Sequence, residues 1–213
     1  MDDYLEDADC RKLSEVPASA ATCRVFLVDA RQAGWIADIH MTADVLLIRF
    51  PCRPDSGSPL PPDDVFGLEA SFHSASCTLA WVTVPQKYRR RKLAGWMVAQ
   101  LAHECARRNI AHITGAIEPN DEALPFWLSL SPELHRSGKP VNISEALHRR
   151  GVRFTLDVAS LLARPLPVSL LSEDEFAGLL QRRSPSHPKP NNASDVVPQQ
   201  NDPCSVDPFW LYM

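Results

Sequence analysis

The sequence predicts a single α+β domain in which strands and helices alternate irregularly along the chain. Three observations support this prediction: 45% of the 213 residues are apolar, several short stretches are β-branched, and one long amphipathic segment lies mid-chain. A chain of this size and composition can bury one core. The segments follow in the order β-β-β-α-β-α-α-β, which is typical of the α+β class.

Composition divides the chain into three segments. Residues 1–22 form an acidic N-terminal segment, and residues 23–183 carry the predicted domain. Residues 184–213 are rich in Pro, Ser, Asn and Gln without apolar periodicity. Such a composition cannot bury enough surface to offset the entropy of ordering, so we predict a disordered tail. Its apolar end, Phe209–Met213, is a candidate for docking on a partner.

Three strands open the predicted domain. They are rich in β-branched and apolar residues over strand lengths, and they are Cys23–Asp29, Val45–Phe50 and Cys77–Val84. The stretch Pro51–Asp64 contains five prolines together with Ser, Gly and Asp. This stretch is therefore predicted to be a loop between two strands.

A long helix is predicted over residues 93–108. Leu93, Met97, Leu101 and Cys105 recur at i, i+4 spacing, which places them on one apolar stripe of the helix. A stripe of this kind packs against a core, so we expect the helix to cover the sheet.

The elements after this helix are shorter. We expect a strand at His112–Ile117, helices at Asp121–Leu130 and Ile143–Arg150, and a last strand at Val152–Asp157. Pro125 is compatible with the first turn of the second helix, because the N–H group that proline lacks has no helical partner there.

A basic cluster lies between the third strand and the long helix. The stretch Lys87–Met97, KYRRRKLAGWM, has five basic residues in six positions and then becomes apolar. A turn before a helix exposes the first N–H groups of the helix and the positive end of its dipole, so it favours an anion. We expect Lys87, Arg89, Arg90 and Arg91 to add side-chain charge, and a pyrophosphate to fit better than a single carboxylate.

Residues 77–130 resemble the acyl-CoA-binding core of the GNAT superfamily of N-acyltransferases. In that family a strand leads through Val-x-Pro-x-x-Arg to Gln/Arg-x-x-Gly-x-Gly/Ala, then to a long helix, a strand and an Asn-x-x-Ala-x-x-Phe-Tyr helix. The matching positions in this sequence are Val84-Pro85, Tyr88-Arg89, Ala94, Asn120, Ala123 and Phe126.

The resemblance implies a GNAT-like fold with a mixed, mostly antiparallel split sheet flanked by helices. It implies transfer of an acetyl group from acetyl-CoA to a primary amine by direct attack. The acceptor would be an amine of a small molecule, a protein lysine or a protein N-terminus. The residues implied for the cofactor site are Val82, Val84, Arg89, Arg90, Arg91, Lys92, Leu93, Ala94, Gly95, Asn120 and Trp127.

Two positions depart from the family pattern. Lys92 stands where the family has its first motif glycine, and its Cβ interferes with close approach of the backbone to phosphate, a cost that its ammonium can offset. Trp127 stands where the family commonly has a tyrosine that protonates the departing thiolate. Turnover can survive this second change, since a thiolate with a pKa of about 8.5 needs little protonation. The alternative is a catalytically weak or inactive GNAT-fold binding or scaffold protein.

The acceptor amine has to lose a proton to a general base. Glu69 and His73, just ahead of the Cys77–Val84 strand, are the candidates. No metal site is predicted, because the six cysteines include no C-x-x-C pair. His103 and Glu104 point about 100° apart on their helix and form no ligand pair.

The overall charge limits the possible partners. With 22 Lys and Arg against 26 Asp and Glu, the formal net charge is -4, so the chain is no general binder of polyanions. A nucleic-acid contact is disfavoured, because the basic cluster is single and lacks stacking aromatics around it. No apolar run spans a bilayer and the N-terminus is acidic, so we expect an intracellular protein, cytoplasmic or nuclear, without a membrane partner.

Overall fold

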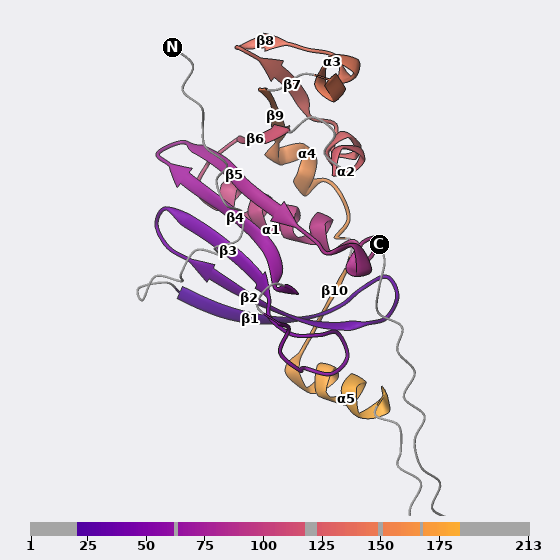
Figure 1. Ribbon diagram of the computed structural model, residues 1–213. Helices are drawn as coiled ribbons and strands as arrows, with labels where there is room; N and C mark the ends of the chain where they lie inside the picture. Colours follow the sequence, from indigo (N-terminus) through magenta and orange to yellow (C-terminus); the bar gives the residue numbers. More distant parts are fainter. Residues whose placement is uncertain (1–20, 62–63, 118–122, 149–150, 167, 184–213) are drawn as a thin grey trace, which may run out of the picture. The chain divides into compact units, whose positions relative to one another are not determined.

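The computed structural model describes residues 21–61, 64–117, 123–148, 151–166 and 168–183 (Figure 1). These residues form a ten-stranded sheet in the order β10-β1-β2-β3-β4-β5-β6-β9-β7-β8. Within it, the β5–β6 pair is parallel and the other strand pairs are antiparallel. The predicted α+β class with a mixed, mostly antiparallel sheet is therefore confirmed.

The predicted terminal segments lie mostly outside the described residues. This applies to residues 1–20 of the acidic N-terminal segment and to the whole predicted tail at residues 184–213, including Phe209–Met213. The predicted docking of that apolar end stays a prediction. None of the helices in the described part of the chain has both the length and the apolar character that crossing a bilayer requires.

Five antiparallel strands form the first part of the sheet. They are β1 (Ala21–Val28), β2 (Gly34–Met41), β3 (Val45–Phe50), β4 (Phe66–His73) and β5 (Ser76–Thr83). The sequence predicts β1, β3 and β5 within two residues at each end, but it misses β2 and β4. Both missed strands carry polar side chains on one face, which interrupts the apolar run on which the prediction depends.

The remaining strands complete the two sides of the sheet. β6 (His112–Ile117) and β9 (Val152–Asp157) have the predicted bounds. Three short strands were not predicted: β7 (Glu133–Arg136), β8 (Lys139–Pro140) and β10 (Ser169–Leu171), of which β10 pairs with β1 at the opposite edge.

The helices connect and cover the strands. They are η2 (Gln86–Tyr88), α1 (Leu93–Arg107), α2 (Leu124–Ser129), α3 (Ile143–His148), α4 (Val158–Leu162) and α5 (Glu173–Arg183). The sequence predicts α1, α2 and α3, and it misses α4 and α5. Pro125 lies in the first turn of α2, as expected.

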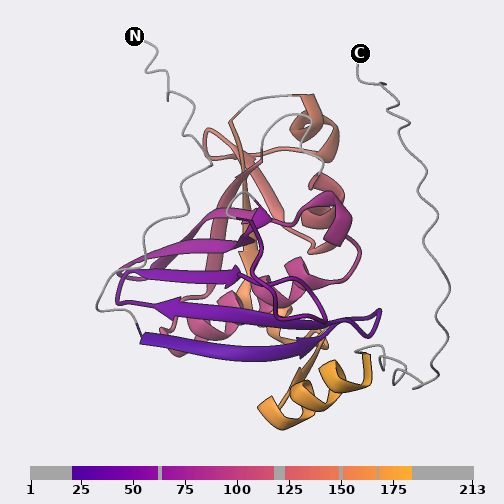
Figure 2. The same ribbon diagram turned by 60° about the horizontal axis from the view of Figure 1, so that its bottom comes forward.

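The helices α1 and α5 lie on opposite faces of the sheet. The ring of Trp35 packs against Phe50, which in turn packs against Trp96 of α1, with centroid distances of 5.8 and 5.9 Å. A Cβ on the preceding residue, Gly34, would lie 2.8 Å from the ring of Phe176 in α5. Because successive strand residues point to opposite faces, α5 covers the face away from α1, at the β1 edge (Figure 2).

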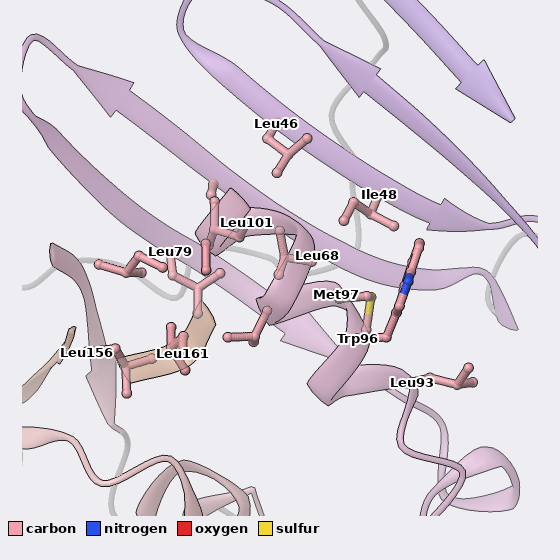
Figure 3. Packing of buried hydrophobic residues seen from close by; sticks show 14 of the residues in the cluster. Leu46, Ile48, Leu68, Leu79, Leu93, Trp96, Met97, Leu101, Leu156 and Leu161 are labelled. Atoms are coloured by element: carbon pink, nitrogen blue, oxygen red, sulfur yellow. The ribbon is translucent and has the colours of Figure 1, made fainter. Parts of the chain in front are cut away.

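The apolar side of α1 closes the main core. Trp96, Met97 and Leu101 are 0% exposed and belong to one cluster with Ile48 and Leu68 of the sheet (Figure 3). Burial of side chains of this size stabilises the folded state by about 1.5–3 kcal/mol each. The predicted apolar stripe of the helix is therefore confirmed as the face that meets the sheet.

Ion pairs hold the C-terminal end of α1. The Glu104 carboxylate accepts hydrogen bonds from Arg107 and Arg108, both at 2.6 Å. Arg108 also donates to the carbonyl oxygen of Thr42 at 3.0 Å, and its guanidinium carbon lies 3.9 Å from the centroid of the Phe72 ring. This arrangement fastens the end of the helix to the β2–β3 turn.

Candidate functional site

Two buried side chains fix the turn between β5 and α1. Tyr88 in η2 is 9% exposed, and its ring centroid lies 5.1 Å from that of Trp35 and 5.6 Å from that of Phe66. Leu93, the first residue of α1, is 1% exposed. The basic residues between these two anchors therefore have to turn over the surface.

Two residues of this turn have a left-handed backbone. The φ angle is 61° at Arg90 and 65° at Lys92. This conformation costs roughly 1–2 kcal/mol in a residue that has a Cβ, and such strain is concentrated at functional sites. A left-handed residue followed by a right-handed one, as Lys92 is by the helical Leu93, also turns successive N–H groups into one concavity, which is a known way to bind an anion.

The helix α1 begins with N–H groups that precede its hydrogen-bond ladder. Its first α-helical bond runs from the N–H of Trp96 to the carbonyl oxygen of Lys92, at 3.1 Å. The N–H groups of Leu93, Ala94 and Gly95 come before this bond and have no intrahelical acceptor. Lys92, at the N-cap, makes no side-chain capping bond. These amides and the positive end of the helix dipole favour an anion.

Two of the basic side chains in the turn are directed elsewhere. The ammonium of Lys87 pairs with Asp64 at 2.7 Å, and a guanidinium nitrogen of Arg91 pairs with Asp29 at 3.1 Å. The expectation that Lys87 and Arg91 add their charge around the helix amides is corrected by these pairs. Acidic residues from distant parts of the chain, which the local pattern does not show, take up both charges.

The other three basic side chains are exposed around the turn. The Nε–H of Arg89 donates to the carbonyl oxygen of Val84 at 3.2 Å, which holds the guanidinium at the end of β5. Neither Arg90 nor Lys92 forms an ion pair within the described part of the chain. The positive charge next to the helix amides therefore comes mainly from these two residues.

The buried carboxylate of Asp29 ties this turn to the β1–β2 hairpin. It accepts hydrogen bonds from the indole of Trp35 at 2.8 Å and from the N–H groups of Arg31 and Ala33 at 2.7 and 3.0 Å. It also accepts the bond from Arg91. Burial by itself raises the pKa of Asp29, but these four hydrogen bonds outweigh burial and lower the pKa below its ordinary value.

A cavity of about 460 Å³ lies over the turn. Its walls come from the end of β5, the basic turn, the first turn of α1 and the helix α2. The lining includes every described residue that the resemblance implies for the cofactor: Val82, Val84, Arg89, Arg90, Arg91, Lys92, Leu93, Ala94, Gly95 and Trp127. Asn120 lies outside the described residues.

Four further lining residues were not predicted from the sequence. They are Thr83, Tyr88, Ala123 and Phe126. Ala123 and Phe126 belong to the second-helix motif, which was a sufficient signal to include them. Tyr88 is also one of the matching positions, so the sequence offered a signal for it as well. Thr83 becomes visible as a lining residue only in the folded chain, where the end of β5 and the turn of η2 meet.

The strand β5 leaves β6 after two residue pairs. The parallel pairs are Cys77 with Ile113 and Thr78 with Thr114. Beyond Thr78, the edge of β5 that faces β6 has no strand partner among the described residues, while β4 continues to pair with its other edge. The cavity begins at Val82, further along this open edge. Unpaired backbone groups are therefore available beside the cavity.

The indole of Trp127 forms one wall of the cavity. It is 5% exposed and stacks on the ring of Phe154, with a centroid distance of 4.8 Å and an interplanar angle of 24°. Phe154 in turn lies over Gly115, where a Cβ would be 2.3 Å from the ring. The glycine lets Phe154 approach β6 and thereby sets the position of Trp127. This wall is apolar and offers no acid at neutral pH.

The two predicted general bases lie in different parts of β4. Glu69 pairs with Trp81 of β5, and its carboxylate accepts a hydrogen bond from the indole N–H at 3.0 Å. The β4–β5 register shifts at this point, as it does at a β-bulge. His73 pairs with Ser76 at the hairpin, roughly 20 Å along the strands from the cavity end of β5. The fold thus brings Glu69 near the cavity edge, but not His73.

Comparison with known proteins gives structural similarity without a sequence match. No family model matches the chain, and no curated protein matches its sequence. Among solved structures, a mutant of the cAMP-binding acyltransferase from Mycobacterium smegmatis has a TM-score of 0.47 and 10% sequence identity. The match covers 76% of this chain and 55% of that chain.

Two acetyltransferases are further structural neighbours. Nourseothricin acetyltransferase has a TM-score of 0.40 at 10% identity, covering 65% of this chain and 87% of that chain. The ribosomal-protein alanine N-acetyltransferase from Escherichia coli has a TM-score of 0.36 at 16% identity, covering 63% of this chain and 76% of that chain. The three solved structures named here are thus one acyltransferase and two acetyltransferases.

Proposed function

We propose that the chain is an acyl-CoA-dependent N-acyltransferase that moves an acetyl group from acetyl-CoA to a primary amine. The cavity at the end of β5 carries this proposal. It combines helix amides that precede the hydrogen-bond ladder, the cations of Arg90 and Lys92, an apolar wall and an open strand edge. The amides and cations match the pyrophosphate of an acyl-CoA molecule, and the apolar wall and open edge match its pantetheine arm.

The turn before α1 suits the pyrophosphate of the donor. The amides of Leu93, Ala94 and Gly95 would donate to its oxygens, and Arg90 and Lys92 would supply the opposite charge. Hydrogen bonds between ionised groups are about twice as strong as neutral ones. The dipole of a helix as long as the 15-residue α1 adds to this attraction.

The open edge of β5 suits the pantetheine arm. This arm carries two amide groups, and an extended amide chain can pair with a free strand edge as an added strand would. The side chains of Val82, Phe126 and Trp127 line the same space and would contact the methylene groups of the arm. The thioester would then reach the opening between β5 and β6.

We propose direct attack by the amine on the thioester. The C–N bond forms and the C–S bond breaks, its electron pair leaving with sulfur, while the amine loses one proton. Glu69 is the proposed acceptor of this proton, directly or through a water molecule. Trp127 cannot protonate the thiolate, which at a pKa of about 8.5 can leave unaided and take a proton from solvent.

Direct attack is supported by the lining of the cavity. A covalent acyl-enzyme would need a nucleophile activated by a base. Among the described residues, the lining contains no Ser, Cys, His, Asp or Glu, so no base in the lining can activate Thr83, Tyr88 or Lys92. The proposed acceptor is an amine of a small molecule, a protein lysine or a protein N-terminus, which would approach the opening from the face that carries Glu69.

Thermal unfolding with and without millimolar acetyl-CoA tests the donor site. A ligand that binds only the folded state raises the unfolding midpoint, so we expect a clear rise in the parent protein and a smaller one in Arg90→Ala. Arg182→Ala, which removes an exposed arginine of α5, should keep the rise of the parent. No change of midpoint in the parent would contradict the donor site.

Release of free thiol from acetyl-CoA in the presence of primary amines separates an enzyme from a binding protein. We expect amine-dependent thiol release that falls by about 10²–10⁴-fold in Glu69→Gln, the range for loss of a general base. The glutamine can still accept the bond from Trp81, so its unfolding midpoint should stay near that of the parent. Acetyl-CoA binding without thiol release for any amine would favour the binding-protein alternative.

A further inference from the structure

A second cavity adjoins the first along α1. It has a volume of about 360 Å³ and lies between α1, α2 and the segment that follows α4. Lys92, Gly95 and Phe126 line both cavities. A ligand held on the amides of the turn can therefore extend from the first cavity into the second without leaving the surface of α1.

The second cavity combines apolar walls with two cations. Its apolar lining includes Val98, Ala99, Leu130 and Leu161, and its cations are Lys92 and Arg164. One guanidinium nitrogen of Arg164 donates to the carbonyl oxygen of Ser129 at 2.9 Å, which fixes the group at the end of α2. Arginine has five N–H donors, and neither cation forms an ion pair within the described ranges.

We propose that the second cavity binds the adenosine 3′-phosphate end of the acyl donor, with Lys92 and Arg164 on the 3′-phosphate. This proposal rests on the function proposed above, because it starts from a pyrophosphate on the turn. Coenzyme A has two arms beyond that group, a neutral pantetheine and an adenosine with a third phosphate. The open edge of β5 suits the neutral arm, and the cavity with two cations suits the charged arm.

The apolar lining fits the rest of this arm. A purine has two flat apolar faces, and the aliphatic side chains from α1, α2 and α4 together with the ring of Phe126 can cover one of them. The cations stand on the lining beside these apolar groups, so one ligand that is both flat and anionic can satisfy both kinds of contact. A simple phosphate ion would leave the apolar part of the cavity unused.

The proposal also gives a reason for a lysine at a left-handed position. At the φ angle of 65° found for Lys92, a glycine would carry no strain, whereas a residue with a Cβ does. Strain of this kind persists where the side chain gains an interaction in return. A cation that faces both cavities can contact the pyrophosphate and the 3′-phosphate of the same molecule.

A consequence is selection of the donor by its nucleotide. The two cations would favour acetyl-CoA over acetyl-3′-dephospho-CoA, which lacks only the third phosphate. Acetyl-pantetheine, which lacks the whole nucleotide, would bind more weakly still. The two cavities would therefore discriminate against acyl groups carried on phosphopantetheine without adenosine.

Calorimetric titration with acetyl-CoA and acetyl-3′-dephospho-CoA tests the assignment. We expect the parent to bind acetyl-CoA roughly tenfold more tightly than acetyl-3′-dephospho-CoA, because the second donor loses hydrogen bonds to charged groups. This ratio should fall towards one in Arg164→Ala and be partly kept in Arg164→Lys. Lys92→Ala, which keeps a Cβ at the left-handed position, should lower it as well.

Controls separate recognition from a merely structural effect. Arg164 also contacts Ser129, and loss of that contact alone would weaken both donors equally and leave their ratio unchanged. Arg182→Ala in α5 should show the ratio of the parent.

The outcomes distinguish the two proposals. Equal affinity of the parent for the two donors, or a preference that Arg164→Ala retains, would overturn the second-cavity assignment and leave the transferase proposal standing. Absence of binding by either donor would overturn both. A preference that disappears in Arg164→Ala and survives in Arg182→Ala would support the assignment.

Discussion

The two ends of α1 use basic residues in opposite ways. At the C-terminal end, Arg107 and Arg108 both pair with Glu104 at 2.6 Å. At the N-terminal end, Arg90 and Lys92 have a left-handed backbone and no acidic partner within the described residues. The first group of charges is satisfied within the protein, whereas the second group is exposed beside a cavity.

The difference shows which charges serve the fold. Cations at the C-terminus of a helix interact favourably with its dipole, and cations at the N-terminus do not. Arg90 and Lys92 therefore contribute little to stability until an anion joins them. The C-terminal end holds the helix to the sheet, and the N-terminal end keeps its donors and charges for a ligand.

Removal of the Glu104 carboxylate, which Arg107 and Arg108 share, should have the largest effect on stability. Glu104→Ala leaves the partly buried Arg108 without its partner, so we expect a loss of about 3 kcal/mol in the free energy of unfolding. Arg107→Ala, which removes a mostly exposed arginine and leaves Glu104 paired with Arg108, should cost only about 0.3–0.5 kcal/mol. Urea unfolding measures both changes. Equal effects of the two substitutions would mean that Glu104 does not hold this end of the helix.

Removal of the tether at the other end should have the next largest effect. Asp29→Asn places an amide among four hydrogen-bond donors next to the largely buried Arg91, with an expected cost of about 2–3 kcal/mol at neutral pH. Because the pKa of Asp29 is lower in the folded than in the unfolded state, its contribution is complete above the unfolded pKa of about 3.9. It is lost as the pH falls through the folded value.

The difference in unfolding free energy between the parent and Asp29→Asn should therefore narrow below about pH 4. Urea unfolding from pH 7 to pH 3 gives this difference directly. A difference that stays constant over the whole range would show that the charge of Asp29 is not what stabilises the turn.

Relief of the backbone strain at Lys92, the N-cap of α1, should have the smallest effect on stability. Lys92→Gly should stabilise the unliganded protein by about 1 kcal/mol, because glycine adopts the left-handed conformation without cost. The same substitution removes a cation from both cavities, so acetyl-CoA should bind more weakly. Lys92→Ala should weaken binding without the gain in stability. Thermal unfolding with and without acetyl-CoA reports both effects, and a Lys92→Gly protein less stable than the parent would contradict the account of strain.

The sequence predicts those elements whose own residues show a clear apolar pattern. β3, β6 and β9 have the predicted bounds, and α1 lacks only the last predicted residue. Their apolar residues form a continuous run, alternate along a strand or follow one helical period. β2 and β4 were not predicted, because Asp38 and Glu69 interrupt their apolar runs. In the fold, Asp38 pairs with Arg24 at 2.7 Å and Glu69 with the indole of Trp81 at 3.0 Å, and these cross-strand partners are not visible in a local pattern.

The candidate site was likewise predicted only in part. A strand, a turn and a helix that follow one another place the helix amides and the basic residues together, so the local sequence is enough to predict the turn. The inward direction of Arg91 depends on Asp29, which is 62 residues away. The second cavity depends on Leu161 and Arg164, which β9 and α4 bring beside α1. Neither feature follows from spacing along the chain.

The early separation of β5 from β6 bears on aggregation. A long unpaired strand edge at the rim of a sheet invites pairing with another chain, and proteins avoid this with short or covered edges. Here the outermost described strands, β10 and β8, have three and two residues. The longer open edge belongs to β5, in the interior of the sheet order. The protein can thus offer strand backbone to a small molecule at an edge that lies inside the sheet order and not at its rim.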